Sequence, residues 1–595
     1  MSQRPCKILL KPSARDDIAR DAANRHPMEA GGVLLGYRED NTIVVTHALP
    51  VPSPDEGLNR YTRDDVLANE LLVTFLANRE PDDPTGYIGE WHSHPAPSRP
   101  SPLDVHSLRA IARRSEGPIA LIVHSPDTTR PFTGVVARHQ HLGRVTVRDV
   151  IVTVQSRRAP VLGPLPEGAV RGDGPVFISY RQSDGSERAD SLEGLLRAAG
   201  LVVWRDHTDL RAGTTTDRLE QALTIGLSGA VLVVTPEIAQ STIVKQRELP
   251  RLIELDEDPR FGLCIANEVP NSNDASRPDY SAPDRLLGLA PTRTLGDKKQ
   301  STSRDLAGRL EIVRDLLLHR IEQIKPFVAE SGVLTISTQT RPVPSALDAG
   351  NADLQIRLQA SAHGRLPSQQ GLIDLQAVLP HTSDAIHAAN APTVRLVGGM
   401  HLSVAVALGA ALPETKIGHI EVVDLGGAVW SSSPGDDEPQ THRVEVTPVD
   451  VAASSEIAGP AQVAVFVTLT ENADPTAFKS LVNEQAGQLH AAQIVALTPD
   501  SPVDHREGAR LSRTIANQLK RIAAEFGRAD IHLAFHGPVT MAVLIGRLLN
   551  TLRVTVYEWD NPASGPRYTP VMTLEPGVTG GPITKLYRSG RYLAP

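Results

Sequence analysis

The sequence has little of what marks secreted or membrane-bound proteins. Cysteine occurs only twice, at Cys6 and Cys264, so no disulfide framework is available. No apolar run reaches the roughly 18 residues that a membrane-spanning helix needs, and the first residues do not lead into a signal-type hydrophobic segment. We therefore expect a cytoplasmic protein with no membrane partner.

An excess of positive charge is also lacking. The chain has 60 Lys and Arg against 69 Asp and Glu, a formal net charge of −9. We expect no double-stranded nucleic acid partner, because such a chain has no surplus of cations to neutralise a phosphate backbone, although a local basic pocket for a small anion stays open. What the chain does have is length, since 595 residues predict three or four domains.

Two stretches without periodic apolar residues divide the chain. Residues 156–173 are rich in Gly, Pro and Arg, and residues 326–351 mix Ser, Thr, Pro and Gly. We predict linkers at both stretches, which leaves domains at 1–155, 174–325 and 352–595.

The first domain places two imidazoles close together. His92 and His94 follow a predicted strand at 87–91 and project to the same side of it. Asp104 opens a predicted helix at 104–114, where capping favours a carboxylate. Two imidazoles and a carboxylate are ligands suited to zinc that leave a fourth position for water. The pattern predicts a hydrolytic zinc site.

Two further residues complete the expected chemistry. Glu29 near the water would act as general base and then protonate the leaving amine, and the Ser101 hydroxyl would hydrogen-bond the oxyanion. These motifs resemble the JAMM (JAB/MPN) metalloprotease family, which implies an α/β zinc-hydrolase fold that cuts isopeptide bonds to ubiquitin-like proteins. Asp104 follows His94 by ten residues, one fewer than is usual in that family. Two alternatives stay open: incidental histidines on a surface strand, and a JAMM fold with an idle metal site.

Strands and helices alternate through the middle block. This alternation predicts a parallel sheet with ligand chemistry at the carboxyl ends of its strands. The expected strands are 176–181, 201–204 and 230–234, and the expected helices are 187–199 and 216–226. Together with the charged loop at 205–213, this order resembles a TIR domain, which implies a flavodoxin-like parallel sheet.

TIR domains are either adaptors or enzymes that cleave NAD⁺, and the enzymes use one glutamate in the helix after the fourth strand. Glu248 is the match here, and the resemblance implies that its carboxylate stabilises an oxocarbenium-like ribose. Arg181 and Asp209 would line the nucleotide pocket or its covering loop. Glu237 is a second candidate for the glutamate, and Val244 stands where the family often has tryptophan. The alternative is a scaffold in which Glu248 is only a solvated helix residue.

The last block contains an internal repeat. Residues 396–409 and 533–546 match at an offset of 137, and each segment runs from a strand through a Gly-containing turn into a helix. The matched pairs are Leu396 with Leu533, Ser403 with Thr540, Ala405 with Ala542, and Gly409 with Gly546.

Each repeat offers free backbone N–H groups at a helix start, which suit a phosphate. We therefore predict Gly399, Ser403, Gly537 and Thr540 as binding residues for a pseudo-symmetric nucleotide. The duplication resembles the SAVED domain of bacterial cyclic-oligonucleotide (CBASS) immunity, which implies a duplicated Rossmann-like (CARF-related) fold and a cyclic oligonucleotide ligand. The alternative is a duplicated α/β unit without a ligand.

Together the three resemblances predict an α/β multidomain antiphage effector. A cyclic oligonucleotide, expected to be a cyclic trinucleotide, would drive assembly into oligomers or filaments and activate NAD⁺ hydrolysis. The zinc domain would act on ubiquitin-like conjugates or on a conjugated nucleotidyltransferase. A second hypothesis is a deconjugating peptidase in which the other two domains are a ligand-controlled assembly scaffold, and a third is a scaffold without turnover.

Overall fold

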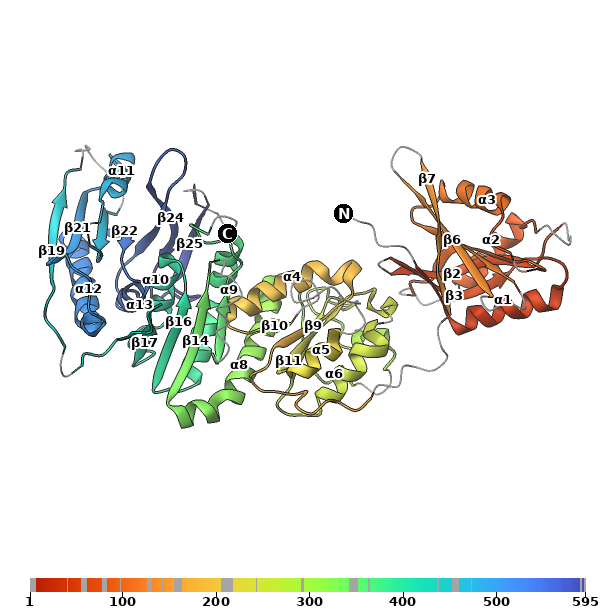
Figure 1. Cartoon of the computed structure of the whole chain (residues 1–595), viewed down its shortest axis with the longest axis horizontal. Helices are drawn as coiled ribbons and strands as arrows, with labels where there is room; N and C mark the ends of the chain where they lie inside the picture. Colours follow the sequence, from red (N-terminus) through yellow and green to blue (C-terminus); the bar gives the residue numbers. More distant parts are fainter. Residues whose placement is uncertain are drawn as a thin grey trace.

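The computed structural model places three α/β parts in a row (Figure 1). It describes residues 7–39, 41–54, 61–77, 83–96, 98–125, 131–140, 144–154, 163–204, 218–241, 243–289, 294–341, 352–361, 364–435, 438–451, 460–471, 473–588 and 591–592. The N-terminal part lies at one end of the row, the middle part follows, and the C-terminal part consists of two sheets side by side.

The N-terminal part is built on one mixed sheet with the strand order β7-β6-β5-β4-β2-β3-β1-β8. Its strands are β1 (Lys7–Leu10), β2 (Gly31–Glu39), β3 (Thr42–Pro50), β4 (Gly86–Ser93), β5 (Ile119–His124), β6 (Phe132–His139), β7 (Val145–Val150) and β8 (Val152–Val154). Its helices are α1 (Pro12–Arg25), α2 (Asp65–Ala77) and α3 (Pro102–Ala112). The predicted strand at 87–91 is therefore part of β4, which lies in the middle of the sheet between β2 and β5.

The middle part has a sheet in which every paired strand is parallel, with the order β10-β9-β11-β12-β13. In chain order this is 2-1-3-4-5, the flavodoxin-like order. Its strands are β9 (Val176–Ser179), β10 (Val203–Trp204), β11 (Gly229–Val234), β12 (Gly262–Asn267) and β13 (Lys299–Ser301). Its helices are α4 (Gln182–Ala199), α5 (Arg218–Ile225), α6 (Leu249–Leu255), α7 (Ala282–Leu287) and α8 (Leu306–Ser331). The predicted alternation of strand and helix is confirmed.

The C-terminal part contains the two halves of the repeat. The first half has the strand order β15-β14-β16-β17-β18, and the second has β19-β21-β20-β22-β23-β24-β25-β26. In each half four parallel strands run in the chain order 2-1-3-4, followed by an antiparallel strand, β18 or β24. The internal duplication is therefore visible in the topology.

The bounds in the first half are β14 (Val333–Gln339), β15 (Leu354–Arg357), α9 (Gln369–Ala388), β16 (Thr393–Gly399), α10 (Leu402–Ala411), β17 (Ile420–Val423) and β18 (Val429–Ser431). Those in the second half are β19 (Arg443–Val449), β20 (Gln462–Thr468), α11 (Thr476–Glu484), β21 (Ala491–Thr498), α12 (Gly508–Glu525), β22 (Asp530–His536), α13 (Val539–Gly546), β23 (Val554–Asp560), β24 (Arg567–Leu574), β25 (Ile583–Arg588) and β26 (Arg591–Tyr592).

The two repeats meet where α10 crosses α13, and the contact is reciprocal. A Cβ on Gly409 would lie 2.2 Å from the Val543 carbonyl oxygen, and a Cβ on Gly546 would lie 2.3 Å from the Val406 carbonyl oxygen. Gly409 matches Gly546 at the same offset that relates Val406 to Val543. Glycine therefore lets equivalent helices approach backbone to backbone across a pseudo-twofold axis.

We expect Gly409→Ala to destabilise the chain. A methyl group cannot fit 2.2 Å from a backbone oxygen, so the helices must separate. Overpacking of this kind costs about 1–3 kcal/mol, more than the gain of about 1 kcal/mol in helix propensity. Urea unfolding should show a lower midpoint for Gly409→Ala than for the control Gly418→Ala, where a Cβ meets open space. Equal midpoints would contradict the close crossing.

The middle part and the first C-terminal half share one hydrophobic core. The same buried cluster contains Leu195 of α4, Leu316 of α8, and Leu375 of α9. Backbone contacts also cross this boundary: the Gln355 N–H donates to the Gly200 carbonyl oxygen at 2.7 Å. The N-terminal part instead has separate core clusters of its own.

The predicted linker at 326–351 is wrong in its first part. Helix α8 continues to Ser331, and β14 follows as an inner strand paired with both β15 and β16. Its alternating residues Leu334 and Ile336 are fully buried. The other predicted linker, 156–173, is also partly packed, because Ala169 and Val170 join the core of the middle part.

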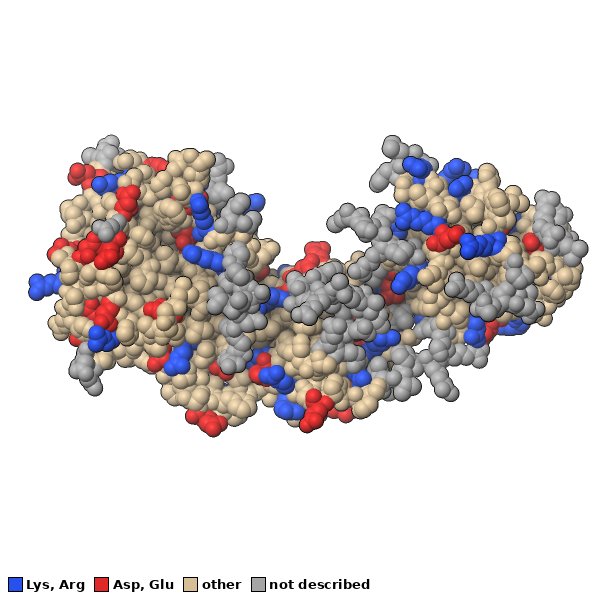
Figure 2. Space-filling view, in the orientation of Figure 1, with Lys and Arg blue, Asp and Glu red and all other residues tan. Residues whose placement is uncertain are grey.

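The visible surface mixes charges of both signs, with Lys and Arg interspersed among Asp and Glu (Figure 2). Within the described ranges, no helix combines the length and apolarity needed to cross a membrane. Cys264 is buried in β12.

Candidate functional site

The structure brings the three predicted metal ligands together. His92 lies in β4, His94 directly follows it, and Asp104 lies in the first turn of α3. The His92 Nε2 is 3.0 Å from the His94 Nε2, and the Asp104 Oδ2 is 3.4 Å and 3.7 Å from these nitrogens. Both imidazoles are buried. The nine residues between His94 and Asp104 are therefore enough to close the cluster.

The start of α3 differs in one detail from the prediction. Ser101, and not Asp104, is the N-cap residue: its Oγ accepts a hydrogen bond from the Asp104 N–H at 3.2 Å, while the Asp104 Oδ2 accepts from the Ser101 N–H at 2.6 Å. This reciprocal capping box fixes the carboxylate. Burial alone would raise the pKa of Asp104, but the hydrogen bond and charge of His92, with the Ser101 N–H, lower it below its usual value.

Glu29 lies beside the cluster in the same cavity of about 270 Å³, which Ser101 also lines. Burial raises the pKa of Glu29, the Asp104 charge adds to the rise, and His92 together with the Tyr61 N–H opposes it. A carboxyl with a raised pKa is suited to move a proton. Glu29 and Ser101 thus line one cavity with the three predicted metal ligands.

The donor set fits zinc. A tetrahedral ion with bonds of about 2.0 Å holds its ligand atoms about 3.3 Å apart, close to the separations of the three atoms here. The Ser98 hydroxyl contacts the His94 Nδ1, which leaves the Nε2 for a metal. Burial and the neighbouring His92 lower the pKa of His94, so the neutral imidazole that metal binding requires is favoured. Sequence reasoning missed Ser98 because its role depends on how the loop folds.

In the middle part, Glu248 lies at the carboxyl end of the sheet. Its Oε2 accepts a hydrogen bond of 2.6 Å from the hydroxyl of Ser179, the last residue of β9. Glu248 ends a π-helical turn, residues Val244–Glu248, that leads into α6. This segment follows β11, the third strand in chain order, whereas the glutamate of the resembled TIR enzymes follows the fourth strand. Val244 is buried, so it has no part in stacking a base.

Arg181 is buried and already paired. Its guanidinium lies 2.8 Å from the Glu237 carboxylate and 3.1 Å from that of Asp184, and it donates to the Gln240 Oε1 at 2.8 Å. A further contact at 3.3 Å reaches the Arg38 carbonyl oxygen in the N-terminal part. The predicted residue Asp209 lies outside the described residues.

The predicted anion-binding residues of the C-terminal part have a different environment. Ser403 and Thr540 are fully buried, and the Ser403 N–H donates to the Glu558 Oε1 at 2.6 Å. Burial raises the pKa of Glu558, partly offset by its hydrogen bonds to Ser403. A carboxylate from β23 therefore occupies the start of α10, where we predicted a phosphate. The sequence does not show that β23 ends beside α10, so this contact could not be predicted; Gly399, Ser403, Gly537 and Thr540 stay predictions as binding residues.

A cavity of about 520 Å³ lies next to these residues, between the two halves. It has two guanidinium groups, Arg341 and Arg365, and the aromatic rings of Trp559 and Tyr568. Two of its lining residues are neighbours in sequence of predicted binding residues: Leu402 precedes Ser403, and His536 precedes Gly537. The other lining residues are Gly364, Asp474, Ala477, Glu558 and Pro566. Guanidinium groups bind phosphates, and rings stack on bases. The composition is suited to a nucleotide.

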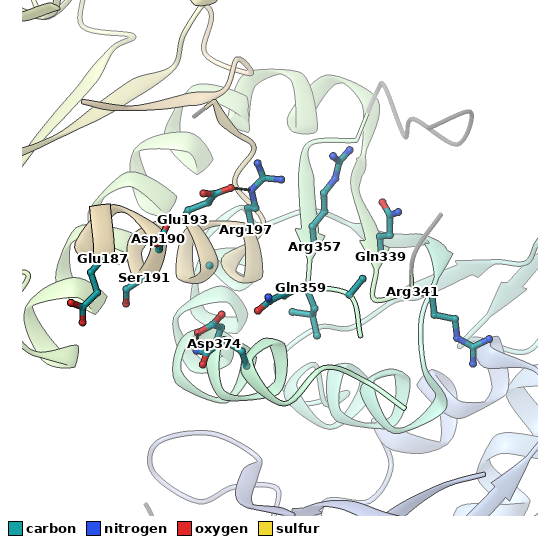
Figure 3. Close-up of a pocket in the computed structure, with 14 residues that line it drawn as sticks. Glu187, Asp190, Ser191, Glu193, Arg197, Gln339, Arg341, Arg357, Gln359 and Asp374 are labelled. Carbon is teal, nitrogen blue, oxygen red and sulfur yellow. Dashed lines mark hydrogen bonds and ion pairs between the residues drawn. The ribbon is translucent and has the colours of Figure 1, made fainter. Parts of the chain in front are cut away.

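A larger cavity, of about 920 Å³, lies where the middle part meets the first C-terminal half (Figure 3). One wall is α4, with Glu187, Asp190 and Glu193, and the opposite wall is formed by the ends of β14 and β15 with Arg341 and Arg357. Arg341 lines both this junction cavity and the cavity of about 520 Å³ between the two halves. In Figure 3 its side chain points away from α4.

Comparison with known families identifies two of the three parts. Residues 11–135 match Prok-JAB, the prokaryotic homologs of the JAB domain. Residues 375–574 match SAVED, the SMODS-associated and fused to various effectors sensor domain. The chain therefore contains a JAB-type domain and a SAVED domain, as the sequence predicted.

Three individual proteins are similar to parts of this chain. The probable metalloprotease y4qB of Sinorhizobium fredii (strain NBRC 101917 / NGR234) is 26% identical over 157 residues, which are 25% of this chain and 90% of that protein. The Acinetobacter baumannii Cap4 SAVED/CARF-domain containing receptor, solved with the cyclic trinucleotide 3'3'3'-cAAA, is 12% identical and covers 79% of this chain and 97% of its own, with a TM-score of 0.33. Protein DSY2949 of Desulfitobacterium hafniense is 18% identical, and the match covers 25% of this chain and 94% of that protein, with a TM-score of 0.20. TM-scores this low do not establish a common fold.

Proposed function

We propose that this chain is a CBASS-type antiphage effector in which a cyclic oligonucleotide controls an NAD⁺-hydrolysing middle domain, with a separate zinc hydrolase at the N-terminal end. The observation that carries the proposal is the single hydrophobic core shared by the middle part and the first SAVED half. A close-packed core changes between discrete packings and does not deform gradually. A ligand-induced rearrangement of the SAVED half would therefore change the packing of the middle part as well.

The cavity between the two SAVED halves is the proposed ligand site. Arg341 and Arg365 would hold phosphates, and Trp559, whose side chain is accessible, would stack on a base. A ring of nucleotides matches a site built from two related halves. Arg341 would carry the signal, since a phosphate that binds its guanidinium also changes a wall of the junction cavity.

Glu248 is the proposed catalytic residue of the middle domain. The flavodoxin-like strand order and the Ser179 hydrogen bond support this role, because they hold one carboxylate at the sheet edge where such folds bind ligands. The carboxylate would stabilise positive charge on the ribose as nicotinamide leaves. Ligand-driven assembly into oligomers or filaments would complete this site by joining the middle domains of neighbouring chains.

The N-terminal domain is proposed to hydrolyse an amide or isopeptide bond. His92, His94 and Asp104 would hold zinc, which when bound acidifies a water and polarises a carbonyl. Glu29 would take a proton from the attacking water and deliver it to the leaving amine. The Ser101 hydroxyl, whose oxygen accepts from the Asp104 N–H, keeps its own proton to donate to the oxyanion.

We expect Trp559→Ala to weaken cyclic trinucleotide binding about 10- to 100-fold. Stacking of one base on an aromatic ring contributes about 1–3 kcal/mol. Calorimetric titration of the full chain with a cyclic trinucleotide measures the effect, and Trp559→Phe should restore most of the affinity because it keeps a ring. Unchanged affinity in Trp559→Ala would place the ligand elsewhere.

The second candidate is a deconjugating peptidase that uses the other domains only for ligand-controlled assembly. The ready-made ligand cluster in the N-terminal domain favours it, because the three donors already face one another. His92→Ala with His94→Ala should then abolish cleavage of a conjugated partner without changing NAD⁺ turnover. No NAD⁺ turnover in the unaltered chain, with peptidase activity present, would favour this candidate over the first.

A further inference from the structure

A second cavity, of about 260 Å³, adjoins the metal cluster. It shares His94 and Pro95 with the cavity that contains Glu29, but Glu29, His92 and Asp104 do not line it. The end of α1 forms one wall through Ala22 and Ala23. Because these side chains are small, the space next to the cluster stays open.

Most of the wall area of this second cavity is apolar, and it comes from two alanine methyl groups, the Met28 thioether and the Pro95 ring. Four polar residues line the cavity as well: His26, Ser93, His94 and His124. An apolar cavity of about 150 Å³ already holds a benzene molecule, so the space here is sufficient for a leucine or an aromatic side chain.

One polar group in this cavity lacks a partner. His124, at the end of β5, lines it with only 9% of its surface exposed, and its Nδ1 has no hydrogen-bond partner within the described part of the chain. The His124 carbonyl oxygen accepts from the His94 N–H at 2.8 Å, so this imidazole is tied to the strand that leads to the metal cluster. A buried polar atom without a partner costs free energy. The His124 imidazole is one of the groups that line the cavity.

We propose that this cavity is a specificity subsite for a large apolar or aromatic side chain on the residue that supplies the cleaved carbonyl. The inference rests on the proposed hydrolase. Glu29 protonates the leaving amine, so the amine side of the substrate lies in the cavity with Glu29. The acyl side then lies across His94, in the second cavity.

This assignment separates two substrate classes. A tail ending in glycine, as in ubiquitin-like conjugates, has no side chain to place in the subsite and leaves it empty. A substrate with leucine, phenylalanine or tyrosine before the cleaved bond fills it, and tyrosine also brings a hydroxyl to the His124 imidazole. The preferred substrate is therefore a peptide or conjugate with such a residue before the cleaved bond.

The test uses the full zinc-loaded chain and peptide amides that differ only in the residue before the cleaved bond: Gly, Ala, Leu or Tyr. We expect kcat/KM for Leu and Tyr to exceed that for Gly at least tenfold. Ala23→Phe should fill the subsite and remove this preference. Asn24→Phe is the matched control, because Asn24 is exposed on the same helix and does not line the cavity.

A binding measurement separates the subsite from the hydrolase. In the Glu29→Gln chain, calorimetry should show tighter binding of the Leu and Tyr peptides than of the Gly peptide, and Ala23→Phe should abolish the difference. Discrimination in binding without cleavage in the unaltered chain would support the subsite and overturn the hydrolase. The subsite would be overturned if cleavage or binding did not depend on the residue before the cleaved bond, or if no peptide bound.

Discussion

Replacing Glu29 by glutamine should lower amide hydrolysis by the zinc-loaded chain about 10²- to 10⁴-fold, the usual contribution of general acid–base catalysis. Glutamine keeps the size of the side chain, but its amide cannot accept a proton from water or return one to the amine. Zinc content should stay unchanged, because Glu29 lies beside the ligand cluster and is not part of it. Peptide amide kinetics and atomic absorption measure the two quantities.

The controls separate loss of the proton carrier from loss of the metal. Glu116→Gln, an exposed glutamate of the same domain, should leave the rate unchanged. His92→Ala should lose both zinc and activity, and a chelator should do the same to the unaltered chain. A Glu29→Gln chain that keeps full activity would contradict the assignment of the proton carrier.

Glu248→Gln should abolish NAD⁺ hydrolysis by the ligand-activated chain, with a loss of at least about 10²-fold. The amide carries no negative charge to stabilise an oxocarbenium-like ribose, although it can still accept the Ser179 hydrogen bond. The rate of nicotinamide release, which is determined by chromatography, measures the effect. The urea midpoint should stay close to that of the unaltered chain.

The matched control for this change is Glu257→Gln, which alters an exposed glutamate a short distance along the same chain segment. It should keep full NAD⁺ turnover. Glu237→Gln should leave turnover measurable, because Glu237 is engaged with Arg181 at the sheet edge. Full activity of Glu248→Gln combined with loss in Glu237→Gln would move the catalytic role to the second candidate.

Local sequence patterns predicted the features that depend on residues close together in the sequence, such as helix ends and the face of a strand on which a side chain lies. The apolar helix pattern before Gly200 gave α4 and its left-handed end, where the φ of Gly200 is 105°. The histidine pair was placed correctly at the end of β4, because side chains two residues apart in a strand share a face. The repeat predicted matching topology, and the structure also shows the reciprocal contacts of Gly409 and Gly546.

Residues distant in sequence could not be assigned in the same way. The cavity between the two SAVED halves is lined by Arg341 and Arg365 from the first half and by Trp559 from the second. Only folding brings these segments together. Glu558 reaches the start of α10 across the same boundary, so the predicted phosphate position holds a carboxylate. The strand β14 was missed because the Ser- and Pro-rich residues after it obscured its short apolar alternation.

One titration tests the central claim most directly. A cyclic trinucleotide is added to the full chain with NAD⁺ present, while nicotinamide release and particle size are followed together. The account predicts that both rise in parallel and saturate, that Trp559→Ala shifts both to higher ligand concentration, and that Glu248→Gln assembles without releasing nicotinamide. NAD⁺ turnover that is the same with and without any cyclic oligonucleotide would contradict ligand control of the middle domain.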